Sequence, residues 1–191
     1  MSDFNDLRTQ LKNSLDKKRF YHSLGVSDTA CALAMRYGYD MDKARIAGLL
    51  HDCARFIPVD KMISKAQKHD IPISKEEMAN PILLHAKLGV LYAKRDYGIN
   101  DEEILGSIRW HTTGKADMSI LEKIIYIADY IEPGRDKQPG LAEVRKLAFE
   151  DLDKCMARIL GDTLNYLSGR DRAIDSMTNE AYKFYEKYGS K

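Results

Sequence analysis

Apolar side chains recur at three- and four-residue steps through almost the whole chain, which is the spacing of one face of an α-helix. Leu7, Leu11 and Leu15 begin this pattern, and a second apolar stripe ends at Gly38, a residue type that commonly terminates helices. We find no segment in which apolar and polar residues alternate as they do in a half-buried β-strand. The chain is therefore expected to be all-α.

Caps, prolines and glycines set the expected helix ends. Asp40 or Asp42 would cap a helix that stops before Pro58, and Ser74 with Glu77 forms a capping box. We expect helices over residues 7–15, 44–56, 60–69, 81–97, 101–114, 118–132, 141–167 and 177–188, and one more that includes His22 and the apolar stripe at 24–37. No repeat, low-complexity stretch or linker divides the 191 residues. We therefore expect one domain over residues 1–191, with its core at about 15–170 and a C-terminal helix at about 177–188 packed on it.

The charge balance limits the classes of partner. The chain has 30 basic and 29 acidic residues, so it lacks the basic excess with which proteins bind nucleic acid. A small anion needs only a few local cations and remains compatible with this balance. No segment resembles a signal peptide or reaches the roughly 18 apolar residues of a membrane span. The three cysteines form no CxxC pair and suit apolar filler in a reducing compartment. We expect a cytoplasmic protein with no membrane partner.

Four of the five histidines lie in apolar segments, each in a different expected helix: His22, His51, His85 and His111. One such histidine alone is more often a hydrogen-bonded core residue than a metal ligand. Asp52 follows His51 within GLLHDC, and Asp129 lies within KIIYIADYIEP, so two carboxylates are also expected to be buried. Buried unpaired charges are costly, and a helical bundle can project such groups into one interior site. The set favours a transition-metal site, because imidazole and carboxylate donors suit Fe, Mn, Zn or Co.

The end of the helix that carries His51 and Asp52 matters for this site. Adjacent helical residues diverge by roughly 100°, so both side chains reach one metal if it sits between their directions near the helix end. That end is expected at Phe56, before Pro58. Gly48, one turn before Asp52, would let another helix approach closely.

The order His22, His51-Asp52, Asp129 resembles the H…HD…D signature of the HD superfamily of metal-dependent phosphohydrolases. Longer blocks resemble the bacterial HD-domain symmetrical diadenosine tetraphosphatases over roughly residues 15–180. These blocks are RFYHSLGVSDTACALA (19–34), AGLLHDCAR (47–55), HAKLGV (85–90), WHTTG (110–114) and EKIIYIADYIEPGR (122–135). HSLGV, HTTG and ADYIEPGR are the specific part, because the HD dipeptide alone occurs in many proteins.

This resemblance implies a single-domain HD-type helical bundle with the metal site in its interior. It implies hydrolysis of a nucleotide partner, diadenosine tetraphosphate, to two ADP by attack of metal-activated water on a bridging phosphoryl. Iron is the metal that it suggests, with Mn or Co as alternatives and one or two ions. The ligands of the first ion would be His22, His51, Asp52 and Asp129. His85 and His111 would either complete a second metal site, with Asp52 bridging, or contact phosphate directly.

Cleavage of a phosphoanhydride also requires positive charge near the phosphate oxygens. Arg135 is the best candidate, because it lies six residues beyond Asp129, just past the helix stop at Pro133-Gly134, and a guanidinium matches phosphate geometry. A surface arginine would explain it as well without the family match. Lys87 and Arg109 are weaker candidates. The expected catalytic residues are Asp52, His85, His111 and Arg135.

Further substrate contacts are expected around the histidines, besides His85, His111 and Arg135 themselves. Thr112 and Thr113 follow His111, so their hydroxyls and amides either bind phosphate or only form a polar helix end. Gly25 lies three residues after His22 and either admits a ligand or serves helix packing. Three aromatic residues flank the ligand segments and are expected in the core rather than stacked on a base: Trp110, Tyr126 and Tyr130.

Two other functions stay open at the level of the sequence. One is a different HD-type nucleotide phosphohydrolase, acting on dNTPs, cyclic nucleotides or guanosine polyphosphates. The other is a non-catalytic nucleotide-sensing HD domain. Residues 178–183 depart from the resembled family, which tends to carry Thr followed by an Ala-Arg-Asn run, and this weakens any expected nucleotide contact there. The oligomeric state is open, with a homodimer as one option.

Overall fold

The computed structural model describes residues 3–136, 138, 140–169 and 174–189. The described residues contain helices and connecting turns but no strand, which confirms the predicted all-α class. The α-helices are α1 (Phe4–Ser14), α2 (Lys17–Tyr37), α3 (Met41–Leu50), α4 (Val59–Lys68), α5 (Lys75–Ala79), α6 (Leu84–Arg95), α7 (Glu102–Trp110), α8 (Ile120–Ile131), α9 (Leu141–Ala148), α10 (Leu152–Ser168) and α11 (Ser176–Gly189). A short 3-10 helix, Pro81–Leu83, leads directly into α6.

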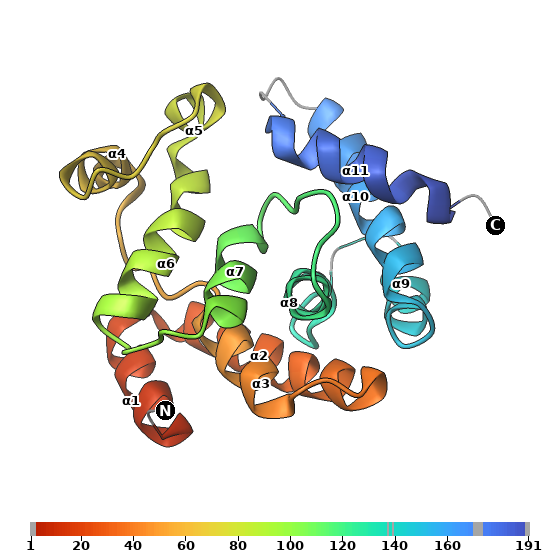
Figure 1. The fold of residues 1–191 in the computed structure, drawn as a ribbon, viewed down its shortest axis with the longest axis horizontal. Coiled ribbons are helices and arrows are strands. Elements are labelled where there is room, and N and C mark those ends of the chain that lie inside the picture. The colour runs from red at the N-terminus through yellow and green to blue at the C-terminus, as the bar shows by residue number, and fades with distance from the viewer. Residues whose placement is uncertain (1–2, 137, 139, 170–173, 190–191) are drawn as a thin grey trace.

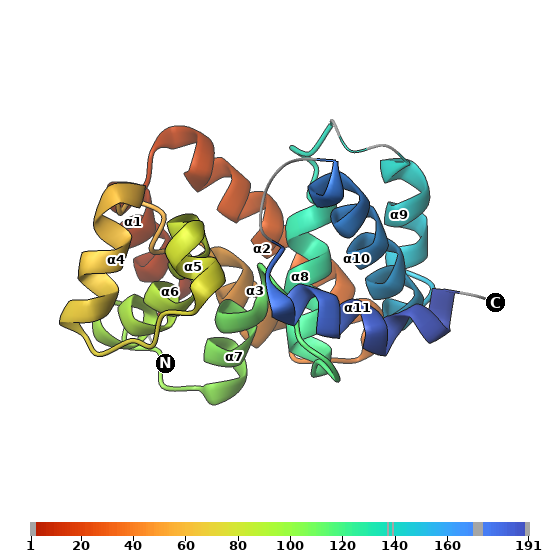
Figure 2. The ribbon, with the colours of Figure 1, turned by 90° about the horizontal axis from the view of Figure 1, so that it is seen from above.

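Helix α8 occupies the middle of the arrangement. It contacts α2, α7 and α10, and in Figure 1 it is seen nearly end-on between α7 and α9, above α2 and α3. Figure 2 shows α4, α5 and α6 at one end of the molecule and α9, α10 and α11 at the other. This central place matches the sequence of α8, in which Ile124, Ile125 and Ile127 are fully buried. The carboxyl-terminal turn of α8 is thereby brought beside the first half of α2.

Close packing of α2 against α3 depends on Gly48, as the sequence predicts. A Cβ atom added to Gly48 would lie 2.8 Å from the Cα of Ser27 and 3.0 Å from its amide nitrogen, both in α2. Side chains rarely tolerate such distances to a backbone, so this position excludes any larger residue without a shift of the helices. The contact sets α2 beside the end of α3 and therefore sets His22 beside His51.

Three predicted helix boundaries were wrong, and one of them belongs to the helix expected to run to Gly114, which ends at Trp110. The helix expected to run to Phe56 ends at Leu50, and turns follow over residues 51–56. The helix expected over residues 141–167 is broken between α9 and α10. Asp151 causes this break, because its carboxylate accepts the amide hydrogens of Asp153 and Lys154 and so caps a new helix. The apolar stripe continues across the break and concealed it.

The C-terminal helix α11 packs on α10, and the hydroxyl of its buried Tyr185 accepts the amide hydrogen of Met118. The end of the chain is thus tied to the segment that leads into α8. None of the helices among the described residues has the length and apolar character needed to cross a membrane.

Candidate metal centre

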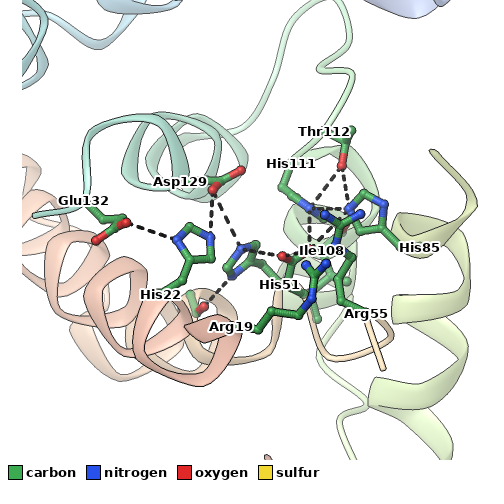
Figure 3. Close-up of polar contacts among 12 residues, drawn as sticks. Arg19, His22, His51, Arg55, His85, Ile108, His111, Thr112, Asp129 and Glu132 are labelled. Atoms are coloured by element: carbon green, nitrogen blue, oxygen red, sulfur yellow. Dashed lines mark hydrogen bonds and ion pairs between the residues drawn. The ribbon is translucent and has the colours of Figure 1, made fainter. Parts of the chain in front are cut away.

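The four histidines predicted as a site do come together, each from a different part of the bundle. His22 belongs to α2, His51 directly follows α3, His85 lies in the first turn of α6 and His111 directly follows α7. Figure 3 shows their rings in one row, with Asp129 of α8 above His22 and His51. The early end of α3 therefore still delivers His51 to the interior.

Three of these rings share one hydrogen-bonding arrangement. The Nδ1 atoms of His51, His85 and His111 lie 2.7, 2.5 and 2.8 Å from the carbonyl oxygens of Gly48, Ile82 and Ile108, each three residues earlier. A carbonyl only accepts hydrogen bonds, so each Nδ1 carries the proton and each Nε2 of the neutral ring offers a lone pair. All three Nε2 atoms face the interior of the site, which is the orientation of a metal ligand.

The possible ligand atoms form two adjoining groups. His22, His51 and Asp129 have ligand atoms within 4.8 Å of one another, with His22 Nε2 3.0 Å from Asp129 Oδ1. His51, Asp52 and His111 form a second such group. His85 joins the second group, because its Nε2 lies 3.3 Å from Asp52 Oδ1. Asp52 and His51 thus lie between the two halves of the cluster.

Two features of the donors match a bound cation. His51 Nε2 is fully buried and has no hydrogen-bond partner, although such a group normally finds one. The Nε2 atoms of His85 and His111 lie 3.0 Å apart, and both carry lone pairs when the rings are neutral. The Thr112 hydroxyl, 3.0 Å from each, can donate its one proton to only one of them. A divalent metal would satisfy the remaining lone pairs, and the nitrogen and oxygen donors suit one.

The protonation states of His51, His85 and Asp52 favour metal binding, which requires neutral imidazoles and ionised carboxylates. Burial lowers the pKa of His51 to about 4 and that of His85 to about 3. Burial acts in the same direction on His111, but the hydrogen bond and charge of Asp52 outweigh it and raise the pKa of His111. Burial alone would raise the pKa of Asp52, yet the surrounding histidines hold it well below its ordinary value. The carboxylate is therefore ionised at neutral pH.

Glu132 contacts the cluster, although the sequence does not predict it there. Its carboxylate is buried, with 4% of the residue exposed, and it lies 3.1 Å from Nδ1 of His22. It also accepts the amide hydrogen of Gly134 at 2.5 Å. A carboxylate on the far nitrogen of a ligand histidine fixes the ring and its tautomer. The available signal was the spacing of Glu132 three residues after Asp129, one helical turn along α8.

Arg135 stands beside the cluster, as its position after α8 suggests. Its Nη2 donates to Oδ1 of Asp129 at 2.5 Å and its Nε donates to the carbonyl of Asp129 at 2.9 Å. Arg145 of α9 holds the same loop by donating to the carbonyl oxygens of Ile131, Glu132 and Arg135. Arg135 is therefore fixed at the rim of the site rather than free in solvent.

A cavity of about 860 Å³ opens over the cluster, and we call it the central cavity. His22 and Asp52 contribute to its walls, together with four cations: Lys18, Arg19, Arg55 and Arg135. Arg55 was missed from the sequence; its Nε is buried without a hydrogen-bond partner, 3.6 Å from Oδ2 of Asp52. Four carboxylates line the cavity as well: Asp16, Asp52, Glu132 and Asp136. The cations beside the candidate ligands can contact an anionic ligand such as a chain of phosphates.

The other predicted substrate contacts have different outcomes. Gly25 lines the central cavity, but a Cβ there would lie 2.5 Å from Oε2 of Glu132, so the missing side chain makes room for that carboxylate. Thr112 faces the histidines, whereas the buried hydroxyl of Thr113 donates to the carbonyl of Gly114. The structure thus brings Thr112, but not the hydroxyl of Thr113, to the cluster.

The weaker cations and the aromatic residues lie around the cluster rather than in it. Lys87 is paired with buried Glu77 at 2.7 Å, and Arg109 stacks on the ring of Trp110. Tyr126 is in the core, as predicted. Trp110 and Tyr130, also predicted to be in the core, are only half-buried and pack against it, and Tyr130 lines a second cavity.

This arrangement of helices, histidines and carboxylates defines an HD domain, and the HD-domain family model matches residues 19–134. The crystal structure of a predicted HD superfamily hydrolase involved in NAD metabolism from Clostridium acetobutylicum is 42% identical, with a TM-score of 0.93 over 98% of this chain and 99% of that one. Symmetrical bis(5'-nucleosyl)-tetraphosphatases from Bacillus subtilis and Halalkalibacterium halodurans are 40% and 39% identical. The matches cover 86% and 90% of this chain, and 87% and 91% of those proteins.

The chain belongs to the family of HD-domain symmetrical bis(5'-nucleosyl)-tetraphosphatases. The predicted family resemblance is thereby confirmed. HD domains bind divalent metal, and the cluster of histidines and aspartates is where this chain supplies the donors.

Proposed function

We propose that this chain is a metal-dependent phosphohydrolase that cleaves diadenosine tetraphosphate symmetrically into two ADP. The observation that carries the proposal is that the histidine and aspartate cluster adjoins a central cavity lined by four basic side chains. A tetraphosphate bridge requires both features, because its reacting phosphorus needs a metal and its many oxygens need positive charge. The activity for which the relatives from Bacillus subtilis and Halalkalibacterium halodurans are named supports the choice of substrate.

The cluster supports an assignment of ligands. His22, His51, Asp52 and Asp129 would hold one metal ion. Asp52 would bridge to a second ion held with His85 and His111, since both of their Nε2 atoms lie within 3.5 Å of Asp52 Oδ1. We favour iron, with Mn or Co as alternatives, on the family resemblance and on the mixed nitrogen and oxygen donors.

When bound, the metal supplies Lewis-acid chemistry, that is, positive charge for phosphoryl oxygens and activation of a water molecule. The protein would hold the phosphates in line through Arg55 and Arg135, which line the central cavity beside Asp52 and Asp129 respectively. The hydroxyl of Thr112 would donate to a phosphoryl oxygen once it is released from the histidines. Glu132 would keep His22 oriented throughout.

Incubation with diadenosine tetraphosphate and Fe²⁺, Mn²⁺ or Co²⁺, followed by chromatography of the nucleotides, tests this proposal. ADP as the sole product is expected, whereas AMP with ATP would mean that a different bond is cleaved. Absence of turnover with all three metals would contradict the proposal, and turnover of dNTPs, cyclic nucleotides or guanosine polyphosphates instead would favour another phosphohydrolase.

Variants connect any activity to the cluster. His51→Ala and Asp52→Ala should abolish both turnover and metal binding while circular dichroism stays helical. His69→Ala is the matched control, because His69 lies at the end of α4, outside the groups of candidate ligands among the described residues. Wild-type activity in His51→Ala or Asp52→Ala would disprove the assignment of the site. A cytoplasmic location and a homodimer stay predictions.

A further inference from the structure

The central cavity and a second cavity share one lining residue, Gln138, beyond the end of α8. The second cavity, of about 620 Å³, lies between α8 and α10. We call it the α8–α10 cavity; its walls include Tyr130, Thr163, Asn165 and Tyr166. Its volume lies within the range of about 300–1,000 Å³ that is usual for small-molecule sites. A ligand held at the metal centre can therefore extend past Gln138 into this space.

Helix geometry explains why the two cavities adjoin. Asp129 and Tyr130 are consecutive in α8, and successive helical residues diverge by roughly 100°. Asp129 consequently faces the histidines while the half-buried ring of Tyr130 faces α10 and lines the α8–α10 cavity. One turn of helix thus presents a metal ligand to one space and an aromatic ring to the next.

The charges of the two cavities differ. Four cations and four carboxylates line the central cavity, whereas the described lining of the α8–α10 cavity has one cation, Arg158, whose charge is balanced by Asp162 at 2.8 Å. The second space therefore suits a neutral group rather than a phosphate. Its aromatic ring and amide side chains suit a planar heterocycle that stacks and forms hydrogen bonds at its edge.

The junction between the cavities holds an unsatisfied acceptor. Oε1 of Gln138 is buried and has no hydrogen-bond partner. A buried polar atom without a partner is costly, so a group that donates to it from a bound ligand is favoured. In a dinucleoside polyphosphate, the sugar with its hydroxyl groups separates the phosphates from the base, and the sugar is therefore the part that would pass Gln138.

We propose that the α8–α10 cavity binds one terminal nucleoside of the substrate, with its base against Tyr130 and its sugar at Gln138, while the phosphates stay in the central cavity. This inference rests on the proposed function and deepens it, because it names the residues that distinguish a nucleoside polyphosphate from a bare polyphosphate. Tyr130 acts in binding and not in the chemical step, so its loss changes KM rather than kcat.

Kinetics of Tyr130→Ala and Tyr130→Phe test the inference. A stacked base contributes enough affinity that Tyr130→Ala should raise KM for diadenosine tetraphosphate about tenfold or more. The inhibition constant of tripolyphosphate, which has no base, should stay unchanged, and Tyr130→Phe should resemble the wild type. Phe149→Ala is the matched control, because it removes an exposed aromatic ring that does not line either cavity and should change neither constant.

Gln138→Leu is an independent variant in the loop after α8, and it should raise KM several-fold with the tripolyphosphate constant unchanged. An unchanged KM in Tyr130→Ala and Gln138→Leu would overturn the inference. So would a parallel rise of KM and of the tripolyphosphate constant, since that would mean damage to the metal centre. If the wild type released no ADP, the proposed function would fail first and this inference with it. If the wild type released ADP normally and neither substitution changed KM, this inference alone would be refuted and the proposed function would stand.

Discussion

Removal of the Glu132 carboxylate should weaken metal binding even though Glu132 belongs to neither group of candidate ligands. Glu132 is buried and lies 3.1 Å from Nδ1 of His22, whose Nε2 faces Asp129. In Glu132→Ala, the His22 ring loses the group that selects its tautomer and its orientation. The variant therefore tests whether the ring is held from behind by a carboxylate, independently of the ligands themselves.

The expected magnitude follows from the kind of contact. Partners of ligand histidines usually change metal affinity or activity by about 10- to 100-fold. Such a change corresponds to about 1.4–2.7 kcal/mol. The upper half of this range is expected, because the contact is buried. Glu132→Gln should lie between Glu132→Ala and the wild type, since its amide oxygen still accepts the hydrogen bond but carries no charge.

Gly25 offers a second way to disturb the same carboxylate without replacing it. A Cβ at Gly25 would lie 2.5 Å from Oε2 of Glu132, so Gly25→Ala should displace the carboxylate and weaken metal binding as well. The same substitution should favour helix α2 by up to about 1 kcal/mol through propensity alone. Gly161→Ala in α10 is the control, because its Cβ would make only an ordinary contact, at 3.4 Å, with Tyr182.

Competition of the protein with a chromophoric chelator for Co²⁺ gives the affinity, and circular dichroism monitors the helical content. Weaker metal binding is expected in Glu132→Ala and Gly25→Ala, with helical content retained and with Gly161→Ala like the wild type. Wild-type affinity in Glu132→Ala would refute the role of the carboxylate. A loss confined to Gly25→Ala would assign the effect to helix packing instead.

Three further changes have definite expected outcomes. Arg135→Ala should lower turnover about 100-fold and lower metal affinity by a smaller factor, because the guanidinium contacts Asp129 but its main expected target is phosphate. Steady-state kinetics test this prediction, and an unaltered rate would remove Arg135 from the site. Gly48→Ala should lower the free energy of unfolding by about 1–3 kcal/mol, because the added methyl group overpacks against the α2 backbone. An unchanged melting temperature would contradict this prediction. Asp101→Ala should cost about 1 kcal/mol by uncapping α7. The hydrogen bond from Lys43 lowers the pKa of Asp101, so the ionised carboxylate stabilises the fold at pH values above the ordinary aspartate pKa of about 3.9. In acid denaturation, the difference in free energy of unfolding between wild type and variant should therefore shrink as the pH falls below that value.

The helical class and the identity of the cluster could be predicted because both depend on local pattern. Apolar spacing and caps define most helices, and four histidines in apolar segments required a common explanation. Glu132 and Arg55 could not be found in this way, because a charged residue at a helix end or in a turn is ordinarily solvent-exposed. Only the packing of α8 against α2 makes Glu132 a partner of His22. The break at Asp151 was missed for a similar reason, since a cap and a polar helical residue look alike within a continuing apolar stripe.

The predicted end of α3 was the most consequential of the wrong predictions, because the actual end of this helix orients the ring of His51, a candidate metal ligand. The last carbonyls of a helix lack intrahelical partners, and the Nδ1–H groups of His51 and His111 satisfy those of Gly48 and Ile108 directly after α3 and α7. The same hydrogen bond fixes the tautomer that leaves Nε2 free for a metal. Had α3 continued to Phe56, the carbonyl of Gly48 would bond to the amide of Asp52, and the ring of His51 would lose its anchor. In this fold, the termination of two helices and the orientation of two candidate metal ligands are therefore one structural event.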